Sequence, residues 1–195
     1  MVLASSNPNK AREFVPLLEG IGVEPMPAGF ELPEETGSTF YENARLKADS
    51  VRAQFLERDG QAPWVMADDS GIEVDALGGA PGIYSSRYAG EDATDRDNLE
   101  KMLRELEGRE DRSARFVCEI VALDPEGREL RGTGRFEGNI AESPRGASGF
   151  GYDPVFIPEG KELTVAEIPA EEKNRISHRA RAARSLLAQL LGGGG

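Results

Sequence analysis

Short apolar runs alternate with amphipathic helical segments along this chain, and this alternation limits the possible fold more than any other feature. The expected strands cover residues 2–5, 64–67, 115–123, 129–136 and 153–157. The expected helices cover residues 9–19, 40–55, 95–106 and 176–190. The strands 115–123 and 129–136 are joined by a short Pro- and Gly-containing turn, so a hairpin interrupts the alternation. The pattern predicts an α/β fold with a mixed sheet.

Capping and breaking residues set the expected ends of these elements. Thr39 fits the N-cap of a capping box in which Glu42 reaches back. Pro16 lies inside the first helical segment and predicts a kink or a short helix. The second strand is expected to end in the sequence Asp-Asp-Ser-Gly at 68–71, where Gly71 would permit a sharp turn.

The charge balance limits the possible partners. The formal net charge is −12, and a field of that sign repels duplex nucleic acid, so we expect no nucleic-acid partner. The same field repels a free nucleotide, so a site for one must gather basic residues or recruit a divalent cation. No apolar run reaches the roughly 20 residues of a membrane span, and no signal pattern is seen at the N-terminus. With Cys118 as the single cysteine, these features predict a cytoplasmic protein without a membrane partner.

Two segments carry residues suited to phosphate and metal. The first runs from the end of a strand into a helix, where backbone N–H groups could hold phosphate: Ser5, Ser6, Asn7, Pro8, Asn9 and Lys10. The second is the carboxylate pair Asp68 and Asp69, which is unfavourable unless a positive charge lies nearby. Mg²⁺ takes such oxygen ligands, and Glu34 could complete the set. Taken alone, each segment also fits an ordinary cap loop or a solvated acidic turn.

Two further segments suit a nucleotide base. Phe150 lies between glycines and could present a stacking face, while Asp153 could accept hydrogen bonds from ring N–H groups. Lys173, His178 and Arg179 are basic residues near the expected start of the last helix, where an anion or an acceptor would compensate them. Each of these also has an ordinary interpretation, as a glycine-rich turn or as surface residues.

Taken together and in order, these motifs resemble the inosine triphosphate pyrophosphatase family, also described as dITP/XTP pyrophosphatases. The matching segments span nearly the whole chain: 4–10, 39–44, 67–71, 78–88, 149–154 and 177–179. Each is weak alone, but six in the same order are specific.

The resemblance implies a role for each matched residue. Substrate contacts fall on Ser5, Ser6, Asn7, Pro8, Asn9, Lys10, Lys47, Ser70, Phe150, Gly151, Tyr152, Asp153, Lys173, His178 and Arg179. Glu34 and Asp69 are implied metal ligands supported by Asp68, and Asp69 is also the proton acceptor. His178 and Arg179 are placed near the 6-oxo group of the base, where adenine would leave their donors unpaired.

The resemblance also implies an α/β protein with a central, elongated mixed sheet flanked by helices and two lobes around a nucleotide cleft. The expected organisation is one two-lobed domain over residues 1–195, with 192–195 as a flexible tail. A homodimer, a magnesium requirement and a nucleotide substrate follow from the same resemblance. The expected reaction converts ITP, dITP or XTP to the monophosphate and pyrophosphate.

Three alternatives stay open from sequence. A pyrophosphatase for modified pyrimidines is disfavoured by the Ser-His-Arg run at 177–179, and a non-catalytic nucleotide sensor by the carboxylates at 34, 68 and 69. A purely structural acidic domain would leave the ordered polar motifs as coincidence.

Overall fold

The structure is a computed structural model that describes residues 1–192 in two compact units. Unit 1 consists of Met1–Asp69, Cys118–Gly134 and the segment that begins at His178, and unit 2 consists of Ser70–Val117 and Arg135–Ser177. Residues 193–195 of the predicted tail lie outside the described residues, while Gly192 ends a helix. That the two units form one two-lobed domain stays a prediction.

The strands and helices interleave as the sequence predicts. The strands are β1 (Val2–Leu3), β2 (Glu24–Pro25), β3 (Val65–Val74), β4 (Ser113–Leu123), β5 (Glu129–Ile140) and β6 (Phe156–Pro158). The α-helices are α1 (Pro8–Leu17), α2 (Phe40–Asp59), α3 (Asp95–Glu105), α4 (Ala170–Ile176) and α5 (His178–Gly192), and two 3₁₀ helices cover Asp75–Leu77 and Gly82–Arg87.

The six strands form one sheet in the order β2-β1-β3-β4-β5-β6. β1 pairs in parallel with both β2 and β3, and β5 pairs antiparallel with β6. The sheet is therefore mixed, and the predicted α/β class is confirmed.

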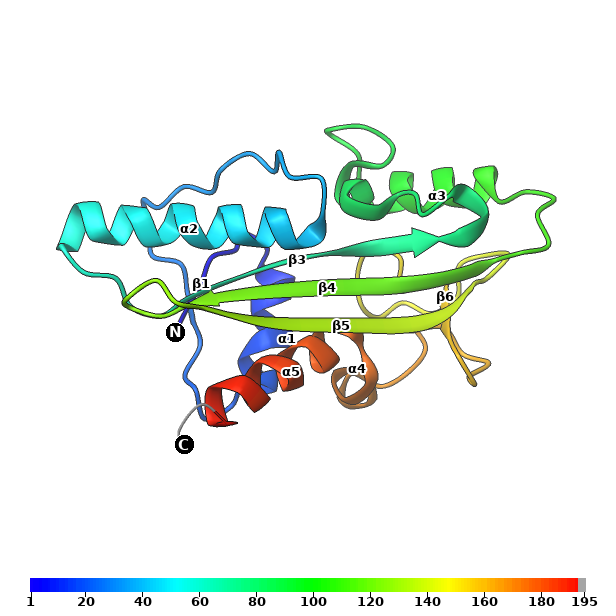
Figure 1. Cartoon of the computed structure of the whole chain (residues 1–195). Helices are drawn as coiled ribbons and strands as arrows, with labels where there is room; N and C mark the ends of the chain where they lie inside the picture. Colours follow the sequence, from blue (N-terminus) through cyan, green and yellow to red (C-terminus); the bar gives the residue numbers. More distant parts are fainter. Residues whose placement is uncertain (193–195) are drawn as a thin grey trace. The chain divides into compact units, whose positions relative to one another are not determined.

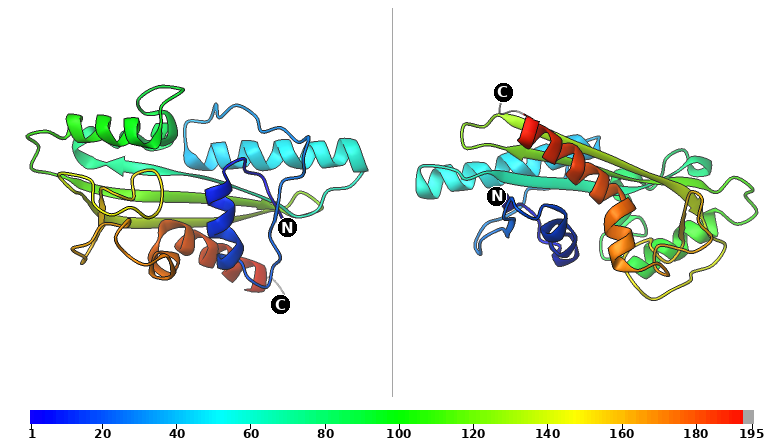
Figure 2. Two further views of the ribbon diagram at one scale, coloured as in Figure 1. Left: turned by 180° about the vertical axis from the view of Figure 1, so that it is seen from behind. Right: turned by 90° about the horizontal axis from the view of Figure 1, so that it is seen from below.

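In unit 1, helices cover both faces of the sheet (Figure 1). Alternate residues of a strand point to opposite faces, and the two apolar clusters of the unit follow this rule. Val65 and Ala67 pack with the apolar side of α2, whereas Met66 packs with α1 and α5. The view from below in Figure 2 shows α1 and α5 beside one another, and the two helices contact each other. Even and odd positions of β3 therefore face different helices.

Unit 2 has an apolar core of its own. Leu99 and Met102 of α3 pack with Ile72 and Val74 at the end of β3 and with residues of β4 to β6. Phe156 packs there against two other rings, with its ring centroid 4.7 Å from that of Phe116 and 5.4 Å from that of Phe136. This core supports the loops between β5 and α4.

The predicted bounds of two strands and of the last helix were wrong. β3 does not end at the Asp-Asp-Ser-Gly run but continues through it to Val74, and Gly71 lies in the strand rather than in a turn. Cations from neighbouring helices meet the two carboxylates, so the strand can carry them. In the strand predicted at 153–157 only the end is extended, in β6. Ile176 ends α4 instead of starting the last helix, because Ser177 has an extended backbone (φ −64°, ψ 163°).

The helix starts agree more closely with expectation. Thr39 Oγ1 accepts from the N–H of Glu42 at 3.1 Å, as an N-cap should. The Glu42 carboxylate reaches back one residue further than a standard capping box, to the N–H of Ser38 at 2.6 Å. Pro16 lies in the last turn of α1, so the helix is short.

Among residues 1–192, no helix is long and apolar enough to cross a membrane.

Candidate functional site

The loop between β1 and α1 is ordered by its own side chains. Asn7 is the N-cap of α1, and its Oδ1 accepts from the N–H of Asn9 at 2.9 Å. The Asn7 N–H in turn donates to Ser5 Oγ at 3.2 Å. Ser6 and Pro8 are exposed. The loop thus places a helix N-terminus, with its partial positive charge, beside solvent.

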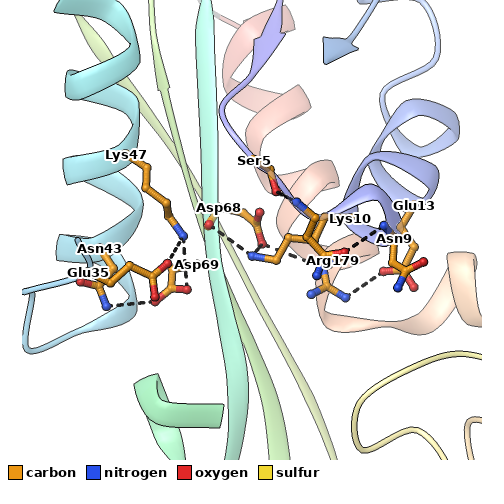
Figure 3. Close-up of polar contacts among 11 residues, drawn as sticks. Ser5, Asn9, Lys10, Glu13, Glu35, Asn43, Lys47, Asp68, Asp69 and Arg179 are labelled. Atoms are coloured by element: carbon orange, nitrogen blue, oxygen red, sulfur yellow. Dashed lines mark hydrogen bonds and ion pairs between the residues drawn. The ribbon is translucent and has the colours of Figure 1, made fainter. Parts of the chain in front are cut away.

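Asp68 and Asp69 are adjacent in β3, so their side chains point to opposite faces of the sheet. Figure 3 shows Asp69 on the side of α2 and Asp68 on the side of α1 and α5. Both residues are buried, with 1% of the surface of Asp68 and 5% of that of Asp69 exposed. The strand therefore supplies one carboxylate to each of two separate charge clusters in unit 1.

The first cluster surrounds Asp69. Lys47 of α2 lies with its Nζ 3.4 Å from Asp69 Oδ1 and 2.7 Å from Glu35 Oε1. Asn43, one helical turn earlier, donates from Nδ2 to Asp69 Oδ2 at 3.2 Å and accepts from the N–H of Gly37 at 2.8 Å. The spacing of Asn43 and Lys47 on α2 thus brings both to the same carboxylate.

The second cluster surrounds Asp68. Lys10 Nζ lies 3.0 Å from Asp68 Oδ2, and the Nε atom of Arg179 lies 4.0 Å from the same oxygen. Arg179 also donates to Glu13 of α1 at 2.9 Å. Asp68 thereby fixes the position of Lys10 at the start of α1 (Figure 3).

The two carboxylates differ in their pKa because their neighbours differ. Burial raises the pKa of Asp69 above its usual value, and the nearby Lys47 and Lys10 offset only part of that rise. Burial also acts on Asp68, but Lys10 and Arg179 outweigh it and hold the pKa of Asp68 below its usual value. Burial lowers the pKa of Lys47, yet the carboxylates of Asp69, Asp68 and Glu35 raise it overall.

The donor set around Asp69 suits a hard cation. Within residues 1–192, no three His, Cys, Asp or Glu side chains are gathered closely enough to hold a metal by themselves. Mg²⁺, however, is usually held by one or two carboxylates together with substrate phosphates and water. Asp69 and a neighbouring glutamate match that smaller requirement. A carboxylate whose pKa is raised by burial also gains from an added cation.

Glu34, the predicted metal ligand, and its neighbour Glu35 have different surroundings. The Glu34 side chain is exposed, whereas Glu35 is half-buried and bonds to Lys47. Glu34 was the predicted ligand, and Glu35, Glu13 and Asn43 were not among the predicted site residues. Glu13 lies three residues after Lys10, so helical spacing is a signal for it, but nothing in the sequence separates Glu34 from Glu35.

In unit 2, the residues expected to bind the base lie together. Lys173 Nζ is 2.6 Å from Asp153 Oδ2 and 4.9 Å from the centroid of the Phe150 ring. Asp153 Oδ2 also accepts from the N–H of Phe150 at 3.0 Å. Asp153 and Lys173 are buried, and Phe150 is half-buried. Asp153 thus links the main chain at Phe150 to the lysine. Ser70, also in unit 2, is half-buried in β3.

Two glycines of β5 allow α5 to lie directly against the strand. A Cβ at Gly134 would lie 2.0 Å from the carbonyl oxygen of His178, and one at Gly132 would lie 2.4 Å from that of Ala182. Both distances are too short for any side chain. The glycines therefore set the height of α5 above the sheet, and with it the positions of the buried His178 and Arg179.

The mixed sheet and the buried clusters of opposite charge define an α/β protein with a polar site at the middle of β3. The chain belongs to the Ham1 family, whose profile matches residues 1–189.

Relatives of known structure or name match over almost their full length. A dITP/XTP pyrophosphatase from Bacillus licheniformis is 47% identical, with 97% of each chain covered. The dITP/XTP pyrophosphatase from Bacillus subtilis is 48% identical, covering 95% of this chain and 93% of that protein. The solved structure of the Staphylococcus aureus Ham1 protein is 41% identical, covers 98% of each chain and superposes with a TM-score of 0.86.

Proposed function

We propose that this protein is a dITP/XTP pyrophosphatase, which hydrolyses non-canonical purine nucleoside triphosphates to the monophosphate and pyrophosphate. The observation that carries the proposal is the pair of buried carboxylates in β3, each facing a lysine, in a chain related over nearly its whole length to dITP/XTP pyrophosphatases. In unit 1 a helix start beside one carboxylate suits a phosphate group, and in unit 2 the ring of Phe150 suits a base.

The residues of unit 1 are proposed to hold the triphosphate. The loop 5–10 offers N–H groups and Lys10, and Lys47 adds a second positive charge. Each lysine is already paired with a carboxylate, so on a chain with a net charge of −12 a divalent cation is still needed to balance the phosphates. Asp68 keeps Lys10 in place, so it acts by positioning.

Asp69 is the proposed proton acceptor. It would take a proton from the water that attacks the α-phosphorus, while the bond between that phosphorus and the bridging oxygen breaks and pyrophosphate leaves. Asp69 and Glu34 are the proposed Mg²⁺ ligands, with Glu35 and Asn43 close to Asp69. Mg²⁺, when bound, supplies neutralisation of the phosphate charge.

The residues of unit 2 are proposed to hold the base. Phe150 offers a stacking face, and Gly151, Tyr152, Asp153 and Lys173 form or support its surroundings. His178 and Arg179, in unit 1, are proposed to read the 6-oxo group. We also propose a homodimer, on the family resemblance alone, and a cytoplasmic location, which suits the buried free thiol of Cys118.

The reaction type is tested by product analysis. With Mg²⁺ present, ITP should give IMP and pyrophosphate, XTP and dITP should be cleaved comparably, and ATP and GTP much more slowly. A chelator should stop the reaction, and added Mg²⁺ should restore it. Chromatography and a pyrophosphate assay measure both products. IDP with orthophosphate would place the attack at the γ-phosphorus and contradict the proposal.

Base selectivity is tested by two substitutions that act in different ways. Phe150→Ala should weaken kcat/KM for ITP and ATP alike, because stacking is nearly independent of base identity. Arg179→Ala should reduce the ratio of the kcat/KM values for ITP and ATP by about 10- to 100-fold, from roughly 1.4 kcal/mol per factor of ten. The same steady-state assay on both nucleotides measures each effect.

The surroundings of Arg179 provide a clear alternative. Its contacts with Glu13 and Asp68 could serve the fold or the phosphate site instead of the base. An equal loss on ITP and ATP, together with a lower unfolding temperature, would assign Arg179 to that role and place selectivity elsewhere.

A further inference from the structure

The loop 149–153, which carries the Phe150 ring, is held by hydrogen bonds on both sides of that ring. The N–H of Phe150 donates to Asp153 Oδ2 at 3.0 Å, and the N–H of Gly151 donates to Asp95 Oδ2 at 2.8 Å. The Tyr152 hydroxyl donates to the carbonyl oxygen of Ser85 at 2.8 Å. Of these partners, Asp95 alone is a surface residue, in the first turn of α3.

The first turn of α3 carries two aspartates with different tasks. Asp97 completes the capping box: its carboxylate accepts from the N–H and the hydroxyl of Thr94, at 2.9 and 2.6 Å. Thr94 in turn accepts from the N–H of Asp97 at 3.2 Å. The N-cap is therefore satisfied without Asp95. The Asp95 carboxylate is directed instead at a main-chain N–H 56 residues further along the chain.

The loop 149–153 needs a hydrogen bond from another element to fix it, because its glycine-containing backbone can adopt many conformations. Gly149 and Gly151 flank the aromatic residue, and both have a positive φ, of +79° and +60°. Glycines reach many conformations, so a loop built on them loses much entropy when a ligand fixes it. A hydrogen bond that already fixes the loop in the free protein reduces this cost of binding.

We infer that Asp95 is a positioning residue for nucleotide binding: it holds the Gly151 N–H and thereby orients the Phe150 ring. This rests on the proposed function, in which Phe150 stacks on the base. Its effect falls on binding, since Asp95 acts through the main chain and is not proposed to touch the phosphates. Loss of the tie raises KM for every nucleotide and leaves kcat nearly unchanged.

The test compares Asp95→Ala with Asp97→Ala, which removes an acidic side chain from the same helical turn. Hydrogen exchange of the amides in 149–153, measured by mass spectrometry without ligand, should become about three- to tenfold faster in Asp95→Ala. KM for ITP should rise by a similar factor, with kcat within about twofold. Asp97→Ala should lower the unfolding temperature but leave exchange in the loop and KM within about twofold of wild type.

Asp95→Asn provides the rescue, because its amide oxygen can still accept from Gly151. It should lie closer to wild type than Asp95→Ala in both exchange and KM. Unchanged loop exchange in Asp95→Ala, or equal effects of the two alanine variants, would overturn the inference. A wild-type protein that fails to release pyrophosphate from ITP would instead contradict the proposed function, and the exchange experiment would still decide the role of Asp95.

Discussion

Replacing Asp69 with asparagine is expected to reduce kcat for ITP by about 10²- to 10⁴-fold, the usual range for loss of a general base. The change keeps the shape of the side chain but removes the negative charge that faces Lys47. An amide can neither take the proton from water nor hold a cation as a carboxylate does. Steady-state rates at saturating Mg²⁺ and nucleotide measure the loss, and circular dichroism checks the fold.

Asp68→Asn is the matched control, because it makes the same chemical change one residue away on the opposite face. It should act mainly by loosening Lys10 and Arg179, with a loss of stability and a rise in KM. Near-normal turnover of Asp69→Asn at saturating Mg²⁺ would exclude Asp69 as both ligand and base.

Gly134→Ala is expected to have the largest effect on stability. The new methyl group would lie 2.0 Å from the His178 carbonyl oxygen and 2.5 Å from the Ala182 nitrogen, so α5 must move. Overpacking typically costs 1–3 kcal/mol, and a clash with backbone is harder to relieve than one with a side chain, so we expect about 3 kcal/mol. For a chain of this length the unfolding temperature should fall by roughly 6–12 °C.

Gly192→Ala, at the other end of α5, is the control for the glycine-to-alanine change itself. A Cβ there meets no atom within 4 Å, so the unfolding temperature should change little. If Gly134→Ala unfolds at the wild-type temperature in calorimetry, the close approach of α5 to β5 is not a constraint on the fold.

The sequence predicts well what is decided locally. The start of α2 follows from Thr39 and was predicted, but the apolar spacing marked the helix only to residue 55, whereas it continues to Asp59. The continuation of β3 through Asp68 and Asp69 was not predicted, because adjacent buried carboxylates are unfavourable by local rules. Their partners, Lys10 and Lys47, come from distant parts of the chain.

In the candidate site, too, contacts set by local spacing are predictable from the sequence, whereas contacts set by packing between distant segments are not. Residues four positions apart on a helix share a face, which explains why Asn43 and Lys47 meet at Asp69. The structure adds that Glu35, rather than Glu34, bonds to Lys47. Which of two neighbouring side chains in a loop points inward depends on packing against α2, and no periodicity reports it.

Because Asp68 and Asp69 face opposite sides of the sheet, the side to which each carboxylate points depends on the number of residues that precede it in β3. Deleting or inserting one residue between Val65 and Ala67 would turn every later side chain of the strand to the other face. The carboxylate of Asp69, which now pairs with Lys47, would then point toward Lys10, although no charged residue had been lost. An insertion of two residues would restore the parity while shifting the pair along the strand. Length changes should therefore be tolerated far better in the loop before α2 than in this strand.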